Sequence, residues 1–195
     1  MERKKFFKIG LLGESSVGKT CIINSYTRNE FIETFPTLGI DPYNVKKTFD
    51  NSEYKFKIID TSGNERDRSL TGTIMKIADG LVVVFAVDNR HSFVKVDFWI
   101  NNIEYLVNLE EKVLYLVGNK SDVEPEKRQV TKEEAESYAK CKKIKYFETS
   151  ACTKKGINEV FEEVFKEVYE ISKINEINKK KEKLHPIERD NWNKK

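Results

Sequence analysis

Cysteine is scarce in this sequence, and long apolar runs are absent. The 195 residues include three cysteines, at positions 21, 141 and 152, and no C-x-x-C pair. This set excludes a disulfide framework and the common zinc sites, and we expect three reduced thiols. No apolar run approaches the roughly 18 residues that a membrane-spanning helix requires. The composition therefore favours a globular domain that lies outside the bilayer.

The N-terminal residues lack the usual targeting signals. Their apolar stretch, residues 6–12, is short and is interrupted by Lys8, unlike the apolar region of a signal peptide. Glu2 occupies the position where N-myristoylation requires glycine. We therefore expect a cytoplasmic protein.

Neither sign of charge dominates, since 35 Lys and Arg face 32 Asp and Glu for a net charge of +3. This balance does not favour a dedicated nucleic-acid-binding protein. Residues 172–195 carry eight basic and four acidic side chains, so the basic excess lies at that end. The length suits one folded domain over residues 1–171, followed by a basic helical extension or tail over residues 172–195.

The tail contains a cluster of lysines at positions 179, 180, 181 and 183. Each could contribute about 1 kcal/mol near an anionic membrane, which predicts a weak membrane contact. The alternative is a solvated tail that continues the last helix.

Short apolar runs alternate with helical patterns along the chain. Residues 6–12, 81–87 and 113–117 have the continuous apolar character of strands that are buried on both faces. Residues 45–49 and 54–59 read as a hairpin, and 145–147 as a short strand. Helices are predicted over residues 19–27, 92–109, 132–141 and 157–171. This alternation predicts an α/β fold with a mostly parallel sheet and a ligand site at the carboxyl ends of its strands.

The first loop with recognisable chemistry follows the first strand and opens the first helix. Its sequence, Gly13-Glu14-Ser15-Ser16-Val17-Gly18-Lys19-Thr20, fits the phosphate-binding pattern G-x-x-x-x-G-K-[ST]. Backbone N–H groups of such a loop surround a phosphate, while Lys19 reaches the β and γ phosphates and the Thr20 hydroxyl binds Mg²⁺. This is the strongest single motif in the chain.

Three further loops follow predicted strands. Each is a weak signal alone, but together with the phosphate-binding loop they indicate a nucleotide site. In Asp60-Thr61-Ser62-Gly63, Asp60 can hold Mg²⁺ or its water, and Gly63 can offer a backbone N–H to a γ-phosphate. In Asn119-Lys120-Ser121-Asp122, the Asp122 carboxylate can accept two hydrogen bonds from guanine, which adenine does not offer in that arrangement. Lys120 can lie over the base, Asn119 can join this loop to the first, and Ser150-Ala151-Cys152 can offer an N–H to the guanine carbonyl.

These four segments, in this order and spacing, resemble a small GTPase of the Ras superfamily over about residues 5 to 170. Residues 13–21, 37–41 and 148–151 are most similar to the Rab family. The resemblance implies a P-loop G domain, with a six-stranded sheet and five flanking helices, that binds GTP or GDP with Mg²⁺. By position, Thr37 would be the switch I residue that binds Mg²⁺ and senses the γ-phosphate, and Phe31 would lie against guanine.

The predicted site can be stated residue by residue. The nucleotide would contact Ser15, Ser16, Val17, Gly18, Lys19, Thr20, Cys21, Phe31, Thr37, Gly63, Asn119, Lys120, Asp122, Ser150, Ala151 and Cys152. Thr20, Thr37 and Asp60 would hold the metal, and Lys19, Thr37 and Asn64 would act in hydrolysis. The resemblance further implies an exchange factor, a GTPase-activating protein and effectors as partners, and peripheral attachment at endomembranes. We expect no nucleic-acid partner and a monomer.

Departures from the family pattern concern catalysis first. Asn64 follows D-x-x-G where the family has glutamine, and its shorter side chain would misplace the amide by about 1 Å. Such a misplacement can cost on the order of 100-fold in rate, unless the attacking water shifts to meet the amide. The segment between Phe31 and Thr37 is also one residue shorter than in typical Rab proteins.

Other departures concern partners and attachment. Pro42, Ile59 and Met75 stand at the positions of three surface aromatics that Rab proteins present to effectors, and Asp67 replaces a usual phenylalanine. No cysteine follows Cys152, so the given sequence holds no site for a C-terminal prenyl group. A truncated chain, a longer natural chain and a protein that acts without prenylation all fit this observation.

Three functions remain open from the sequence. The first is a GTP-hydrolysing molecular switch in vesicle trafficking with a slow intrinsic rate. The second, motivated by Asn64 and the short switch I, is a nucleotide-binding interaction module with negligible hydrolysis. The third, an ATP-dependent P-loop kinase, is disfavoured by Asp122.

Overall fold

The computed structural model describes residues 5–32, 34–35, 37, 39–64 and 67–184. Its strands are β1 (Phe6–Leu12), β2 (Ile40–Phe49), β3 (Ser52–Thr61), β4 (Gly80–Ala86), β5 (Val113–Asn119) and β6 (Lys145–Glu148). Its helices are α1 (Lys19–Arg28), α2 (Arg68–Ile77), α3 (Arg90–Val94), α4 (Val96–Leu106), α5 (Lys132–Lys142) and α6 (Ile157–Leu184). Two short 3₁₀ helices cover Leu109–Glu111 and Pro125–Lys127.

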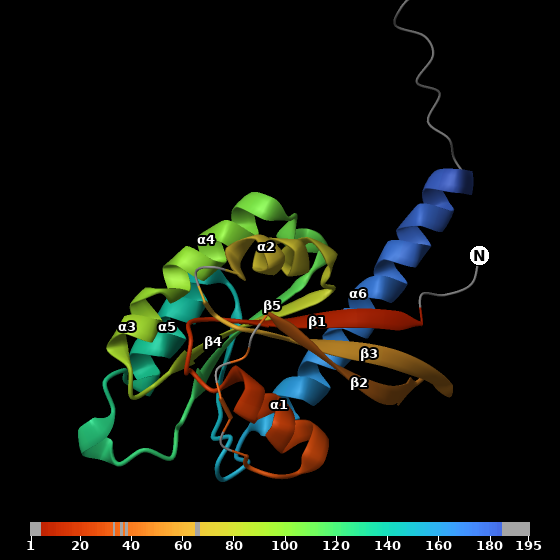
Figure 1. Cartoon of the computed structure of the whole chain (residues 1–195). Coiled ribbons are helices and arrows are strands. Elements are labelled where there is room, and N and C mark those ends of the chain that lie inside the picture. The colour runs from red at the N-terminus through yellow and green to blue at the C-terminus, as the bar shows by residue number, and fades with distance from the viewer. Residues whose placement is uncertain (1–4, 33, 36, 38, 65–66, 185–195) are drawn as a thin grey trace, which may run out of the picture.

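The six strands form one sheet in the order β2-β3-β1-β4-β5-β6. Only the pairing of β2 with β3 is antiparallel among the described strands. Helices α1 and α6 cover one face of the sheet, and α2 to α5 cover the other (Figure 1). Because α3 and α4 adjoin at Lys95, the described helices form five flanking segments, which confirms the predicted G-domain architecture.

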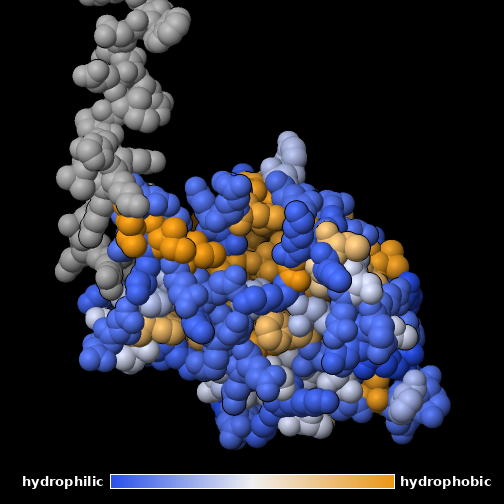
Figure 2. Space-filling model, turned by 180° about the vertical axis from the view of Figure 1, so that it is seen from behind, coloured by the Kyte–Doolittle hydropathy of each residue, from blue (hydrophilic) through white to orange (hydrophobic). Residues whose placement is uncertain are grey.

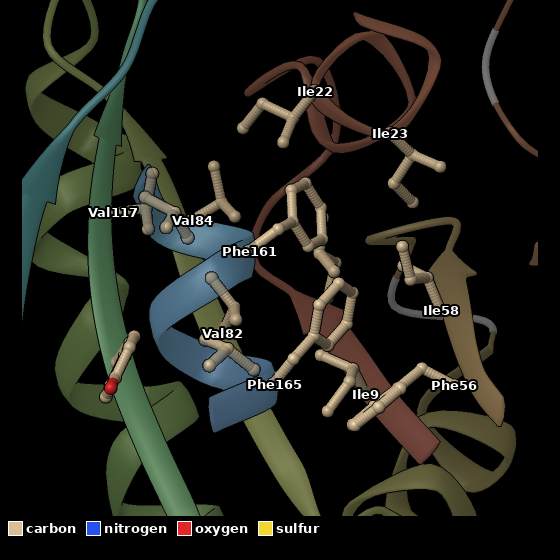
Figure 3. Packing of buried hydrophobic residues seen from close by; sticks show 14 of the residues in the cluster. Ile9, Ile22, Ile23, Phe56, Ile58, Val82, Val84, Val117, Phe161 and Phe165 are labelled. Carbon is tan, nitrogen blue, oxygen red and sulfur yellow. The ribbon is translucent and has the colours of Figure 1, made fainter. Parts of the chain in front are cut away.

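The core under α6 shows why the sequence takes this arrangement. Apolar side chains recur at intervals of three and four residues along α6 and are buried. Phe161 and Phe165 point from α6 toward strand residues such as Ile9, Phe56 and Ile58 (Figure 3). The rings of Phe56 and Phe165 lie 4.4 Å apart between centroids. Side chains at i, i+3 and i+4 of a helix share one face, so this spacing forces α6 onto the sheet.

The predicted hairpin is present as β2 and β3. Its turn consists of Asp50 and Asn51, which have φ values of 45° and 57° and connect the paired residues Phe49 and Ser52. Two central residues with positive φ match the right-handed twist of the strands, and Asp and Asn tolerate this conformation. The antiparallel edge of the sheet thus follows from local turn chemistry.

The single helix predicted over residues 92–109 is wrong in detail. The chain forms α3 from residue 90 to 94 and α4 from 96 to 106, and it becomes extended at Val107, with φ −143° and ψ 154°. The side chain of Asn89 begins α3 by accepting a hydrogen bond from the Ser92 N–H at 3.1 Å. The side chain of Asn108 accepts from the Glu110 N–H and begins a separate turn, so α4 does not continue.

Two further features concern helices α2 and α6. Helix α2 was not predicted. It packs Ile74 and Met75 into the hydrophobic cluster on the sheet face that α2 to α5 cover. Helix α6 continues past residue 171 to Leu184 and projects beyond the sheet (Figure 1). Its extension carries the exposed side chains of Ile174 and Ile177. The face of the molecule opposite the view of Figure 1 is mostly hydrophilic, with apolar patches gathered toward its upper edge (Figure 2).

Within the described residues, no helix combines the length and the apolar character needed to cross a bilayer.

Candidate nucleotide-binding site

The loops after β1, β3, β5 and β6 meet at one edge of the sheet around a cavity of about 500 Å³. Because parallel strands end at the same edge, segments distant in sequence converge there. The described residues that line the cavity are Ser15, Ser16, Gly18, Lys19, Thr20, Cys21, Phe31, Thr34, Phe35, Thr37, Thr61, Ser62, Asn119, Lys120, Asp122, Val123, Ala151 and Cys152. Most of the predicted site residues are therefore brought together.

The loop that precedes α1 forms a tight cradle. Gly13 has φ +135° and Gly18 has φ +93°. A Cβ atom on Gly18 would lie 2.3 Å from the Asn119 side-chain nitrogen, and one on Gly13 would lie 2.1 Å from the Val84 carbonyl oxygen. Glycine is thus required at both positions, for conformation and for space. This geometry lets backbone N–H groups face an anion.

Lys19 lies inside this cradle with 5% of its surface exposed. Its Nζ donates hydrogen bonds to the carbonyl oxygens of Gly13 at 2.9 Å and Glu14 at 2.8 Å. Burial lowers the pKa of Lys19 to about 8, although the charges of Asp60 and Glu14 oppose this shift. A buried cation with only partial compensation favours an anionic ligand such as a phosphate.

Thr20, Thr37 and Asp60 meet at the same end of the cavity. Thr20 Oγ1 lies 2.8 Å from Thr37 Oγ1 and donates to Asp60 Oδ2 at 2.5 Å, and Thr37 Oγ1 donates to the same oxygen at 3.1 Å. Asp60 Oδ1 is buried and has no hydrogen-bond partner in the part of the chain that the structure describes. Burial raises the pKa of Asp60, while the two hydroxyls and Lys19 oppose the shift.

This oxygen cluster fits a magnesium ion. Mg²⁺ prefers hard oxygen ligands and is commonly held by one or two protein carboxylates or hydroxyls together with phosphates and water. The buried, unpartnered Oδ1 of Asp60 is the kind of acceptor that a cation or its water would satisfy. The described residues contain no group of three or more His, Cys, Asp or Glu that would indicate a different metal centre.

Asn119 joins three loops at the other end of the cavity. Its Nδ2 donates to the Val17 carbonyl oxygen at 2.9 Å. Its Oδ1 accepts from the Thr149 hydroxyl at 3.2 Å and from the Ala151 N–H at 3.3 Å. Since all these groups are buried, Asn119 fixes the positions of the loops after β1, β5 and β6.

The residues predicted to surround the base lie next to this junction. Lys120 has φ +63°, and its Nζ pairs with Asp88 Oδ2 at 3.3 Å. Asp122 and Cys152 line the cavity, and Phe31 does so with 44% of its surface exposed. Together these side chains offer an apolar surface and a carboxylate acceptor to a planar, hydrogen-bonding ligand.

Five predicted residues do not line the cavity directly. Val17 and Ser150 are buried behind it, and Asp60 contacts Thr20. A Cβ atom on Gly63 would lie 2.5 Å from both the Gly13 carbonyl oxygen and Lys19 Nζ, so Gly63 packs against the cradle. Asn64 is exposed, and its backbone N–H donates to Ser62 Oγ at 3.2 Å.

The sequence prediction missed Thr34, Phe35, Thr61, Ser62 and Val123 as lining residues. Each lies within or next to one of the loops that the sequence motifs identified, or between Phe31 and Thr37. The loops were thus recognised, but the direction of individual side chains was not.

Positions expected to differ from the Rab effector surface also have distinct environments. Pro42 is exposed on β2, whereas Ile59 and Met75 are buried. Asp67 accepts a hydrogen bond from Ser62 Oγ. This surface therefore lacks the exposed aromatics that the resemblance implied at these positions.

Comparison with known proteins gives the family. The sequence matches the Ras family over residues 8–170. The chain belongs to the Ras family. It is 34% identical over 171 residues to the Ras-related protein Rab-11C of Dictyostelium discoideum, covering 87% of this chain and 75% of that protein.

Other relatives agree with this assignment. The GTP-binding protein ypt3 of Schizosaccharomyces pombe is 33% identical over 181 residues, covering 92% of this chain and 84% of ypt3. Human Ras-related protein Rab-8B is 38% identical over 156 residues, covering 80% of this chain and 74% of Rab-8B. This Ras-family chain is a Rab-like small GTPase, which confirms the resemblance drawn from the four loops.

Proposed function

We propose that this chain is a guanine-nucleotide-dependent switch that binds GTP or GDP with Mg²⁺, hydrolyses GTP slowly and acts in vesicle trafficking. The observation that carries the proposal is the junction of Thr20 and Thr37, which line the same cavity as Asp122, with the buried carboxylate of Asp60. Thr37 lies 17 residues from Thr20 in sequence and belongs to neither a helix nor a strand. A ligand that holds Thr37 in place would thereby order the segment that carries it.

The chain's own residues support a role for each end of the nucleotide. The N–H groups of residues 15–20 and the Lys19 ammonium would bind the phosphates, and Asp122 would accept hydrogen bonds from guanine. Thr20, Thr37 and Asp60 would hold Mg²⁺, which neutralises phosphate charge when bound. Phe31, Lys120 and the loop of Ser150, Ala151 and Cys152 would enclose the base.

Hydrolysis requires a water placed in line with the bond that breaks. The water attacks the γ-phosphorus, the bond to the β-phosphate oxygen breaks, and inorganic phosphate leaves. Lys19 would stabilise the developing charge, and the Asn64 side-chain amide would orient the water. An arginine from a GTPase-activating protein would supply further stabilisation, because no described arginine lines the cavity.

The geometry at Asn64 also supports a second candidate function. Its side chain is exposed and does not line the cavity, and it is one methylene shorter than the family's glutamine. A nucleotide-binding module with negligible hydrolysis would keep every binding contact and lose only the orientation of water. Exchange factors and effectors would be partners under either function, with peripheral association at endomembranes.

Single-turnover hydrolysis of GTP with Mg²⁺ separates these functions. We expect slow hydrolysis by the parent chain and an increase of about tenfold or more in Asn64→Gln, because the longer amide restores the water contact. Asn64→Ala is the matched control and should be slower than the parent. Tight guanine-nucleotide binding with no turnover in any variant would favour the binding module, and failure to bind guanine nucleotide would contradict both functions.

A further inference from the structure

Ser62 and Asp67, on either side of Asn64 in sequence, form a side-chain pair that the nucleotide-binding motifs do not include. Ser62 Oγ donates a hydrogen bond to Asp67 Oδ2 at 2.5 Å. Ser62 is 6% exposed and Asp67 is half-buried, so the hydrogen bond is partly shielded from water. A hydrogen bond to a carboxylate in such a place is stronger than one between neutral groups.

The Ser62 side chain and the Asp67 backbone each contact the backbone of Asn64. Ser62 Oγ accepts from the Asn64 N–H at 3.2 Å, and the Asp67 N–H donates to the Asn64 carbonyl oxygen at 3.1 Å. The Asp67 carbonyl oxygen in turn accepts from the Thr71 hydroxyl at 3.1 Å, on the first turns of α2. The Asn64 backbone is therefore tied to both Ser62 and the start of a helix.

Ser62 and Gly63 lie at the phosphate end of the cavity. Ser62 lines the cavity, and Gly63 approaches the cradle so closely that a Cβ atom there would meet Lys19 Nζ and the Gly13 carbonyl oxygen at 2.5 Å. Asn64 is the next residue, so a small rotation of its backbone would move its amide relative to the γ-phosphate position. Displacement of a catalytic group by about 1 Å can cost on the order of 100-fold in rate.

We infer that Ser62 and Asp67 are a positioning pair that holds the Asn64 backbone beside the phosphate end of the site and thereby restricts where its side-chain amide can reach. This inference rests on the proposed function, in which Asn64 orients the attacking water. An acid at position 67, where the resemblance implies phenylalanine, gives Ser62 a charged hydrogen-bond partner. The pair compensates in part for the short side chain of Asn64 by restricting where its backbone can lie.

The test is single-turnover GTP hydrolysis with four variants. Ser62→Ala and Asp67→Ala should each lower the rate about tenfold, the double variant should lose no more than either single one, and Asp67→Asn should keep most of the rate because it retains an oxygen acceptor. GDP affinity and melting temperature, measured on every variant, show whether the fold and the nucleotide site are intact. Thr73→Ala, which removes an exposed side-chain hydrogen bond to the Ser69 carbonyl on α2, is the matched control and should not change the rate.

The same substitutions are repeated in the Asn64→Ala background, and the hydrolysis rates are compared. This comparison distinguishes an effect that acts through Asn64 from a general structural effect. If the pair acts through Asn64, then Ser62→Ala and Asp67→Ala change nothing further in that background. Equal losses in both backgrounds, additive losses, or unchanged rates in the single variants would overturn the inference. If Asn64→Ala itself hydrolyses GTP as fast as the parent, the proposed role of Asn64 fails, and this outcome is distinct from failure of the pair alone.

Discussion

Two buried, charged residues at the cavity, Lys19 and Asp60, have incomplete hydrogen bonding. Lys19 is a buried cation that donates to two carbonyl oxygens, and Asp60 keeps one buried oxygen without a hydrogen-bond partner among the described residues. Buried polar groups normally find partners, so unfulfilled groups at one end of a cavity mark a site that is completed by a charged ligand. Phosphate carries the charge opposite to that of Lys19, and Mg²⁺ carries the charge opposite to that of Asp60.

The choice of base also rests on one residue. We predict that Asp122→Ala lowers GDP affinity about 100-fold or more, because two charge-assisted hydrogen bonds to guanine are lost. Affinity for ADP, which does not offer these donors, should stay within about threefold of the parent value. Competition against a fluorescent guanine nucleotide measures both. Equal losses for both nucleotides would instead indicate that Asp122 supports only the fold of the loop.

At the scale of elements, α4 is coupled to the phosphate-binding loop. The Trp99 indole N–H donates to Glu14 Oε1 at 3.1 Å, and the carbonyl oxygen of Glu14 accepts from Lys19 Nζ. Trp99 is almost fully buried in the cluster that also contains Met75 of α2. Trp99 thus connects the hydrophobic cluster under α2 to α5 with the phosphate-binding loop around Lys19.

We predict that Trp99→Phe raises the dissociation rate of GDP about fivefold, because the ring remains while a hydrogen bond of roughly 1 kcal/mol is lost. The rate is measured by displacement of a fluorescent nucleotide. Glu14→Gln keeps an oxygen acceptor for the indole and should change the rate less. A dissociation rate in Trp99→Phe equal to that of the parent would show that α4 does not act on the loop through this contact.

Elements with a local cause were predictable from the sequence, and those that depend on packing were not. The turn at Asp50 and Asn51 and the stripe that includes Phe161 follow from residue type and spacing. Helix α2 contains Gly72 and has no side-chain N-cap hydrogen bond, so it depends on burial of its apolar residues against the sheet. The break between α3 and α4 at Lys95 has no comparable local signal.

The site follows the same division. The four loops were identified from motifs because phosphate and guanine impose particular residue types at fixed spacing. The contacts of Ser62 with Asp67 and of Trp99 with Glu14 join residues that no motif relates. The segment between Phe31 and Thr37 is shorter than in typical Rab proteins, so the sequence did not show whether Thr37 approaches Thr20. In the structure their hydroxyl oxygens lie 2.8 Å apart.

At the scale of the whole molecule, the core under α6 stabilises the framework on which the loops are mounted. Phe165 is fully buried between α6 and β3. We predict that Phe165→Ala lowers the free energy of unfolding by about 3–5 kcal/mol, whereas Ile174→Ala, at an exposed position, changes it by less than about 0.5 kcal/mol. Urea denaturation of the GDP-bound protein measures both. Similar effects of the two substitutions would contradict the burial described here.

The basic end of the chain gives a second prediction at this scale. The parent protein should sediment weakly with anionic phosphatidylserine vesicles at low salt and be released near physiological ionic strength, since each lysine contributes about 1 kcal/mol and is screened. Replacing lysines 179, 180, 181 and 183 with alanine should abolish the sedimentation. Neutral phosphatidylcholine vesicles are the control. Absence of binding by the parent at low salt would favour a solvated tail.

The central claim is that guanine nucleotide changes the conformation of this protein. Backbone hydrogen exchange, compared between the GDP complex and the complex with a non-hydrolysable GTP analogue, tests it most directly. We predict slower exchange over residues 31–39 and 62–77 with the GTP analogue, because Thr37 and Gly63 gain contacts at the γ-phosphate, and unchanged exchange in β4 and β5. Identical exchange of these segments in both complexes would contradict a switch and would leave a protein that only binds nucleotide.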